Sequence, residues 1–330
     1  MEPRGAWCKG CRMDARTRNE RIHVRTTSVG IIGMGWVGTS VAISTLHAGV
    51  AREVLLNDVR GDVAEGEAMD LAHGASFYPA ASVRTAPVEE MVECDAVVIA
   101  AGHGGKPGES RLDLLRDNAA IVRAITARLR GLRGLLVLVT NPVDVLTWVA
   151  ADASGLPPER VIGTGTMLDT ARLRQMLGAE LNVDPRSIHA QVVGEHGDSE
   201  VVLWSGARVG GVRLRDWPGW KAADEPALAK QVRVAAYEII RRKGATNHAI
   251  GLVTAALLRG VLRGERRVLT VARVQRGALG YDGVALSLPT VVGLDGAAQV
   301  LEPAMTDAER AALDRSAAVL REAIAAVREA

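Results

Sequence analysis

Residues 28–49 read SVGIIGMGWVGTSVAISTLHAG, an apolar run that enters a glycine-rich turn and continues with residues of helical periodicity. The glycines Gly33, Gly35 and Gly38 have the spacing G-x-G-x-x-G. In this pattern the first glycine permits a tight turn, the second lets the backbone approach a pyrophosphate, and the third lets the helix pack closely on the strand. The phosphates then lie at a helix N-terminus, where free N–H groups favour anions. The stretch therefore predicts a strand, a turn and a helix that bind a dinucleotide.

A second apolar run, residues 54–57, is followed by Asp58, which lies 20 residues beyond Gly38. A carboxylate at this place can accept hydrogen bonds from both ribose hydroxyls, and it repels the 2′-phosphate of NADP. We therefore expect NAD to be the cofactor. The glycine spacing is a weak signal alone, and the second strand with its acidic residue makes it specific.

The alternation of strands and helices continues along the first half of the chain. Apolar runs at 96–101 and 135–140 predict central parallel strands buried on both faces, and helices are predicted at 112–130 and 143–153. This order is typical of an α/β fold with a doubly wound, Rossmann-type parallel sheet. Ligands bind at the carboxyl ends of the strands in such sheets, so we expect the reacting groups at that edge.

Residues 102–111, GHGGKPGESR, follow directly on one of these strand ends. Their glycines, proline and basic residues predict a loop that closes over the site as a lid, with a solvated connection as the alternative. Asn141-Pro142 follows the strand at 135–140, so the asparagine is expected at the same edge, with the proline fixing the turn.

The composition is that of a globular protein: 330 residues, 48% of them hydrophobic, with a net charge of +2. So small a charge favours neither a nucleic acid nor a membrane as partner. No apolar run approaches the roughly 20 residues of a membrane helix. The three cysteines are too few for a disulfide framework, and the C-x-x-C of Cys8 and Cys11 lacks a second pair to complete a zinc site. We expect a cytoplasmic protein without a metal site.

We divide the chain into a basic tail at 1–26, a dinucleotide-binding domain at 27–163 and a catalytic domain at 164–330. The tail has six arginines and few apolar residues, which predicts disorder. An arm that embraces another subunit, or a start codon upstream of Met13, would explain it equally. In the catalytic domain we predict strands at 188–194, 267–274 and 284–290, a hairpin at 201–212 and helices at 167–181, 227–243, 247–259 and 307–329.

Residues 193–199, VGEHGDS, place His196 in a polar, glycine-flanked turn after an apolar strand. A positioned imidazole can give and take a proton near neutral pH, although a satisfied loop histidine is an equal interpretation of this residue alone. Asp169 and Arg172 lie three residues apart in the helix that follows Gly163-Thr164-Gly165, and therefore on one face. They could form a simple surface ion pair. At the crevice, however, the arginine can hold a carboxylate bidentately and the aspartate can orient an imidazole.

Eight motifs in this order resemble the L-lactate and malate dehydrogenase family, the NAD-dependent L-2-hydroxy acid dehydrogenases. They are GIIGMGWVG, GEAMDLAHGASF, KPGESRLDLL, TNPVD, GTGTMLDTARLR, VGEHGDSEV, KGATNHAIG and SLPTVVG. The resemblance runs from about Ser28 to the C-terminus, and GEHGDSEV and KGAT are closer to the lactate branch. It implies a Rossmann domain followed by an α+β substrate domain, a 2-keto or 2-hydroxy acid as substrate, and a homo-oligomer, with a tetramer favoured over a dimer.

The resemblance also assigns roles to single residues. His196 matches the proton donor and acceptor, and Asp169 matches the aspartate that holds its imidazole. Arg172 matches the arginine that binds the C1 carboxylate of the substrate, and Arg111 matches the lid arginine that polarises the C2 carbonyl. Together they provide the acid, the carboxylate anchor and the cation that reduction of a 2-keto acid requires.

Further residues receive secondary roles from the same resemblance. Asn141 is assigned to the substrate and the cofactor, Asn118 to the cofactor, and Thr246 to the wall of the substrate pocket, although Thr246 could simply cap the helix at 247–259. Arg174 and His189 coincide with positions that bind fructose 1,6-bisphosphate in allosteric bacterial lactate dehydrogenases. An arginine on a helix and a histidine at the start of a strand are also ordinary surface residues.

One position departs from the family pattern. Gly105 stands before Lys106-Pro107, where lactate enzymes have glutamine and malate enzymes have an arginine that pairs with the distal carboxylate. Glycine offers no partner to a second carboxylate, so we expect pyruvate to be favoured, with tolerance for larger 2-keto acids. The alternatives are a malate dehydrogenase in which His103 or Lys106 reaches that carboxylate, a broad-specificity L-2-hydroxy acid dehydrogenase, and a catalytically idle NAD-binding protein.

Overall fold

The computed structural model describes residues 27–105 and 110–328, without the side chain of Arg111. The predicted tail, residues 1–26, lies outside the described residues. The α-helices are α1 (Trp36–His47), α2 (Gly61–His73), α3 (Arg111–Arg128), α4 (Val143–Ser154), α5 (Met167–Leu181), α6 (Glu225–Lys243), α7 (His248–Leu262) and α8 (Asp307–Arg328). Short 3-10 helices are η1 (Val88–Glu93), η2 (Pro158–Arg160), η3 (Pro185–Ser187), η4 (Leu214–Asp216), η5 (Ala222–Asp224) and η6 (Ala278–Gly280). None of the helices in these ranges is long and apolar enough to cross a membrane.

One large sheet runs through the molecule in the order β14-β13-β12-β6-β5-β4-β1-β2-β3. Its strands are β1 (Ser28–Ile32), β2 (Glu53–Asn57), β3 (Ser82–Thr85), β4 (Ala96–Ile99), β5 (Leu135–Leu138), β6 (Val161–Gly163), β12 (Arg267–Arg276), β13 (Asp282–Gly293) and β14 (Gly296–Val300). From β3 to β6 all neighbours are parallel, and the order 3-2-1-4-5-6 is that of the doubly wound fold. The predicted Rossmann-type sheet is confirmed.

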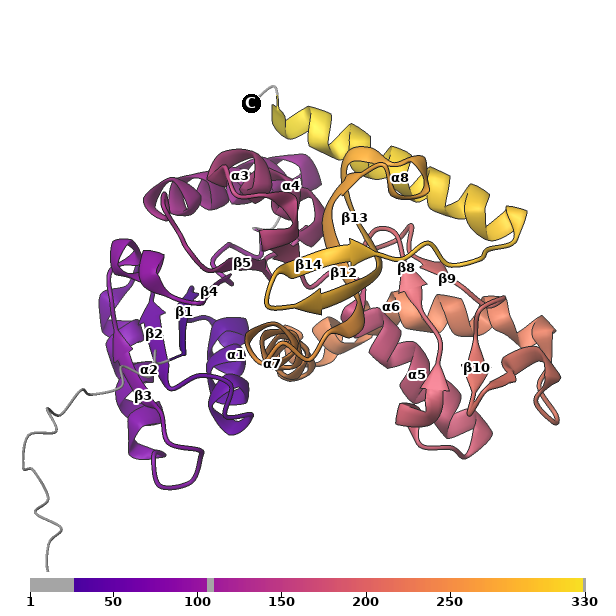
Figure 1. Ribbon diagram of the computed structural model, residues 1–330, viewed down its shortest axis with the longest axis horizontal. Helices are drawn as coiled ribbons and strands as arrows, with labels where there is room; N and C mark the ends of the chain where they lie inside the picture. Colours follow the sequence, from indigo (N-terminus) through magenta and orange to yellow (C-terminus); the bar gives the residue numbers. More distant parts are fainter. Residues whose placement is uncertain (1–26, 106–109, 329–330) are drawn as a thin grey trace, which may run out of the picture.

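The central parallel strands β4 and β5 are apolar throughout because both of their faces are covered. Alternate residues of a strand point to opposite faces, so Val97 and Ile99 of β4 join the core under α3 and α4, whereas Ala96 and Val98 join the core under α1 and α7. Figure 1 shows these two helix pairs on opposite sides of the sheet. A parallel sheet is stable only when both of its faces are covered in this way.

The second half of the chain continues the same sheet with antiparallel strands. Strand β12 runs antiparallel to β6, with Ala272 opposite Gly163, and β13 and β14 follow as a meander. The remaining strands, which form two small sheets, are β7 (Ile188–His189), β8 (Val192–Val193), β9 (Val201–Val202), β10 (Arg208–Val209) and β11 (Val212–Arg213). Residues of α5, β7, β8 and α6 share a separate core there.

Three predictions about the second half were wrong. The single strand at 188–194 is two short strands, because backbone groups at and beside the break bond to side chains of α5: Arg174 donates to the carbonyl of Ala190, and Val192, the first residue of β8, donates to the hydroxyl of Thr170. The hairpin at 201–212 is also divided, since β9 pairs with β8 whereas β10 pairs with β11 and β7.

The third error concerns the ends of α7. The helix begins after Asn247 without a side-chain cap, so Thr246 is not its N-cap. It also continues past Gly260, because Leu258 and Val261 are buried against the sheet. The chain leaves the helix at Gly264 instead, where φ is +63°. Strand β14 was not predicted.

Candidate active site

The glycine turn has the geometry that its sequence predicts. Gly33 has φ +97°, and a Cβ there would lie 2.5 Å from the nitrogen of Ala101. A Cβ on Gly38 would lie 1.8 Å from the carbonyl oxygen of Gly33, so a side chain would separate α1 from the strand. In contrast, a Cβ on Gly35 would meet nothing within 4 Å. Two of the glycines are therefore needed by the fold, and the third faces open space at the N-terminus of α1.

Asp58, which directly follows β2, is hydrogen-bonded to this turn. One carboxylate oxygen accepts a hydrogen bond from the nitrogen of Met34 at 2.7 Å, and the other accepts from the nitrogen of Arg60 at 2.9 Å. Each oxygen keeps a lone pair for a further donor. A cleft of about 810 Å³ lies beside it, lined by Gly33, Gly35 and Asp58 together with residues of the segment after β4 and of α3. The open space at Gly35 and the fixed carboxylate fit the pyrophosphate and ribose of a dinucleotide.

Asn118 links two chain segments near the cleft. It is 1% exposed; its oxygen accepts from the nitrogen of His103, and its amide donates to the carbonyls of His103 and Asn141. These bonds use both hydrogens of the side-chain amide. Asn118 thus links the segment after β4 to the segment after β5, and it places Asn141 at the strand edge where the sequence predicted it.

The turn after β8 brings His196 to the first turns of α5. Its Nδ1 lies 2.5 Å from Oδ2 of Asp169, and Nη1 of Arg172 lies 2.7 Å from Oδ1 of the same carboxylate. Asp169 is 2% exposed, whereas Arg172 and His196 keep 13% and 22% of their side chains exposed. The buried carboxylate therefore holds two groups that still reach the solvent side. The grouping of these three residues, inferred from sequence, is present in the structure.

These contacts change the proton affinities of the pair. Burial disfavours the charged imidazole, but the charge of Asp169 and its hydrogen bond outweigh burial and raise the pKa of His196 to about 9. Burial also acts to raise the pKa of Asp169, yet His196 and Arg172 hold it below its ordinary value. At neutral pH the site therefore contains an imidazolium paired with a carboxylate, which is a proton donor with a fixed orientation.

Several elements fix the turn itself. The nitrogen of Glu195 donates to the hydroxyl of Ser316 on α8 at 2.8 Å, and the nitrogen of His196 donates to Oδ2 of Asp144 on α4 at 2.7 Å. The hydroxyl and the nitrogen of Ser199 both donate to the carboxylate of Glu195. His196 is thus held by its backbone as well as by its ring.

Two buried carboxyl groups beside the pair were missed by the sequence analysis. Asp144 is 2% exposed and Glu200 is 5% exposed. Burial raises the pKa of Asp144 to about 7, and burial together with the charge of Asp169 raises that of Glu200 to about 8. The sequence carried one usable signal for Asp144, an acidic residue in the first turn of the helix that follows Asn141-Pro142.

For the other residues predicted for the site, the structure describes fewer contacts. Arg111 begins α3, and its side chain, like residues Lys106 and Pro107, lies outside the described residues. Gly105 is exposed with φ +86°, and its nitrogen donates to Nδ1 of His103 at 3.2 Å. The Nε2 of His103 lies 3.4 Å from a carboxylate oxygen of Asp117. Thr246 is half-buried between α6 and α7.

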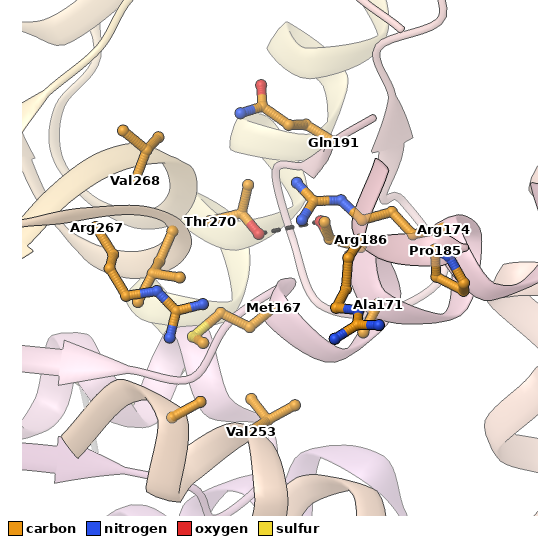
Figure 2. Close-up of a pocket in the computed structure, with 13 residues that line it drawn as sticks. Met167, Ala171, Arg174, Pro185, Arg186, Gln191, Val253, Arg267, Val268 and Thr270 are labelled. Carbon is orange, nitrogen blue, oxygen red and sulfur yellow. Dashed lines mark hydrogen bonds between the residues drawn. The ribbon is translucent and has the colours of Figure 1, made fainter. Parts of the chain in front are cut away.

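Arg174 and His189 lie in different surroundings. Arg174 lines a pocket of about 260 Å³ between α5, α7 and β12, which Arg186 and Arg267 also line (Figure 2). Burial, and then the charge of Arg267, lower the pKa of Arg174. His189 is exposed on β7, opposite Arg208, outside that lining.

Comparison with known proteins identifies one family over almost the whole chain. Residues 27–163 match the family model for the lactate/malate dehydrogenase NAD binding domain, and residues 166–330 match that for the alpha/beta C-terminal domain. The L-lactate dehydrogenase of Salinibacter ruber is 44% identical over 306 residues, covering 91% of this chain and 97% of the relative. That of Kosmotoga olearia is 42% identical over 311 residues, covering 91% and 96%.

A solved structure agrees with these relatives. The minor L-lactate dehydrogenase from Enterococcus mundtii superimposes with a TM-score of 0.89 at 39% identity, covering 92% of this chain and 98% of that one. The cofactor expected from Asp58 is NAD, as the NAD binding domain indicates. By its sequence, its fold and its pair of domain matches, the chain belongs to the lactate/malate dehydrogenase family.

Proposed function

We propose that the protein is an NAD-dependent L-lactate dehydrogenase that interconverts pyruvate and L-lactate. The observation that carries the proposal is the buried carboxylate of Asp169, which holds His196 and Arg172. The relatives reported above are named L-lactate dehydrogenases, which favours this activity over malate oxidation and over a catalytically idle protein.

The chemistry follows from the protonation states. Since Nδ1 of His196 donates to Asp169, Nε2 carries the proton that reaches the C2 oxygen of the keto acid. Bound NADH supplies the hydride to C2. One nitrogen of Arg172 is bonded to Asp169, and its remaining hydrogens bind the C1 carboxylate of the substrate. That anchor fixes which face of C2 meets the cofactor.

The remaining residues complete the proposed site. Arg111 polarises the C2 carbonyl when the lid closes, and Asn141 donates to the substrate near that carbonyl. Thr246 forms part of the pocket wall. Asn118 serves the cofactor by holding Asn141 and His103 in place. Gly33, Gly35, Gly38 and Asp58 bind the pyrophosphate and the adenosine ribose.

We further propose that residues 27–163 bind the cofactor and residues 164–330 carry the catalytic groups, although the two share one sheet. The protein is proposed to act in the cytoplasm as a homo-oligomer, with a tetramer favoured over a dimer. Its relatives support a small 2-keto or 2-hydroxy acid as the partner.

A substrate panel tests the activity and its specificity. With NADH in excess, kcat/KM is measured for pyruvate, oxaloacetate and 2-ketoisocaproate. We expect pyruvate to be preferred over oxaloacetate, because Gly105 offers no cation and Nε2 of His103 lies beside Asp117. A strong preference for oxaloacetate would contradict the proposal, and binding of NADH without turnover of any 2-keto acid would identify an idle protein.

Regulation is proposed at Arg174 and His189, with fructose 1,6-bisphosphate as activator. The arginines that line the pocket of Figure 2 favour a polyanion nearby. Titration with the bisphosphate should lower the KM for pyruvate, and Arg174→Gln should remove the effect. An unchanged KM across the titration would exclude this regulation.

A further inference from the structure

Asp144 on α4 contacts the backbone of His196. It sits in the first turn of α4, where one oxygen accepts the backbone N–H of His196 at 2.7 Å. Its other oxygen is buried without a hydrogen-bond partner among the described residues. The side chain is 2% exposed.

The hydrogen bond to the backbone of His196 does not require a charged acceptor. The side-chain oxygen of asparagine would accept the same N–H, and it would cost less to bury than a charge. The N-terminus of α4 favours an anion, but that offsets only part of the cost. A buried charge that is costly and half unpartnered is better explained by an electrostatic effect on a neighbour.

The neighbour whose charged form Asp144 would stabilise is the imidazole of His196. The groups acting on it are Asp169 and Asp144, which both favour the protonated ring, and Arg172, which opposes it; the buried carboxyl group of Glu200 also lies near enough to interact with the charge of His196. Asp144 in turn is affected by His196, Glu195 and Asp169. Asp144 holds the backbone of His196, whereas Asp169 holds its ring.

We infer that Asp144 is a positioning residue for the reaction: it fixes the backbone of His196 so that the ring meets Asp169, and its charge helps to keep that ring protonated. The inference rests on the proposed function. Above neutral pH Asp144 is ionised while His196 still carries its proton. The charge of Asp144 therefore acts in the pH range in which His196 is deprotonated.

Two substitutions separate the two effects. Asp144→Asn keeps an acceptor for the backbone of His196 and removes the charge, whereas Asp144→Ala removes both. Asp152→Asn is the matched control, since Asp152 is an exposed aspartate on the same helix. The readouts are kcat and KM for pyruvate between pH 5.5 and 10, the Kd of NADH, and the melting temperature.

For Asp144→Asn we expect kcat at pH 6 within about threefold of the parent and an alkaline limb of kcat/KM shifted down by about half a pH unit or more. For Asp144→Ala we expect kcat at pH 6 to fall by about tenfold or more, with the Kd of NADH unchanged. An unmoved alkaline limb in Asp144→Asn, or full activity in Asp144→Ala, would overturn the inference. If Asp144→Ala does not fold, the pH profile of Asp144→Asn decides alone.

A readout without turnover separates this inference from the proposed function. Diethyl pyrocarbonate modifies neutral imidazole, so the pH dependence of modification that is absent from His196→Asn reports the pKa of His196. That pKa should fall in Asp144→Asn and stay constant in Asp152→Asn. Failure of the parent to reduce any 2-keto acid would reject the proposed function, whereas an unchanged His196 pKa would reject the role of Asp144.

Discussion

The Nδ1 of His196 lies 2.5 Å from Oδ2 of Asp169, a carboxylate that is 2% exposed. The contact fixes the tautomer of the neutral ring, because Nδ1 must carry the hydrogen that Asp169 accepts. It also favours the charged ring, because the charge of Asp169 and its hydrogen bond raise the pKa of His196 to about 9. The orientation of the imidazole and its raised pKa thus both depend on one residue of α5.

Replacing that carboxylate should remove both effects. We expect Asp169→Asn to lower kcat for pyruvate by about 10²- to 10⁴-fold, the usual contribution of a positioned acid. The Kd of NADH should not change, because the side-chain hydrogen bonds of Asp169 go to His196 and Arg172 and not to the glycine turn or Asp58. Asp152→Asn serves as control, and near-parental kcat in Asp169→Asn would remove His196 from its role.

The raised pKa of His196 predicts opposite pH profiles for the two directions. Pyruvate reduction needs the protonated ring, so its kcat/KM should be flat to about pH 8 and fall about tenfold per unit above pH 9. Lactate oxidation needs the neutral ring and should rise through the same range. A midpoint near 6.5, the ordinary value for histidine, would show that Asp169 does not raise this pKa.

The same shift contributes to stability. Because the folded pKa of His196 exceeds its ordinary value, its contribution is complete below about pH 6.5 and is lost as the pH rises through about 9. The free energy of unfolding of the parent should therefore fall relative to that of His196→Asn between these pH values. Denaturant titrations of both proteins at pH 6 and pH 9.5 measure the difference, and equal losses in the two proteins would contradict it.

The sequence predicted best what depends on local patterns. The glycine spacing and the buried strands located β1, α1, β4 and β5, because a doubly wound sheet repeats one local unit. It failed where the backbone bonds to side chains of the preceding helix, as at Ala190 and Val192. It also missed that β12 joins β6, a pairing between residues about 100 positions apart.

The residues of the candidate site likewise divide into those that the sequence predicted and those that it did not. His196, Asp169 and Arg172 could be inferred because two short motifs carry them, although only the structure shows that one carboxylate serves both partners. Asp144 could not, because its contact with His196 joins residues 52 positions apart and one aspartate in a helix looks like any other. Gly105 was interpreted through specificity alone, whereas its φ of +86° gives a second reason for glycine.

The glycine turn allows binding and folding to be separated. Gly35→Ala should keep the melting temperature, because its Cβ meets nothing within 4 Å and its φ is −79°. It should weaken NADH binding by about tenfold or more, since the methyl group occupies the space of the pyrophosphate. Gly38→Ala should instead lose about 3 kcal/mol or more of stability by overpacking against Gly33.

Gly61→Ala is the control for both variants, since Gly61 begins α2 and also meets nothing within 4 Å. It should change neither the melting temperature nor the fluorescence titration with NADH. If Gly35→Ala bound NADH as tightly as Gly61→Ala does, the pyrophosphate would have to lie elsewhere in the cleft.

The guanidinium of Arg172 should contribute mainly to substrate binding. Arg172→Lys keeps the charge beside Asp169 but loses the planar fork that binds a carboxylate bidentately. We expect kcat/KM for pyruvate to fall by about 10²- to 10³-fold, mostly through KM, for the loss of about 3–4 kcal/mol of charge-assisted hydrogen bonding. Arg186→Lys, 91% exposed on η3, is the control. An unchanged KM in Arg172→Lys would assign the carboxylate anchor to another residue.

Substrate preference should change when a cation is placed at Gly105. Gly105→Arg provides a guanidinium for the second carboxylate of oxaloacetate, so the ratio of kcat/KM for oxaloacetate to that for pyruvate should rise by about 10- to 100-fold. Both Gly105→Arg and Gly105→Ala carry the strain of a side chain at φ +86°. Gly105→Ala should therefore lose as much stability as Gly105→Arg, but it should keep the substrate ratio of the parent. A rise in the ratio in both variants would mean that backbone conformation, and not the charge at this position, selects the substrate.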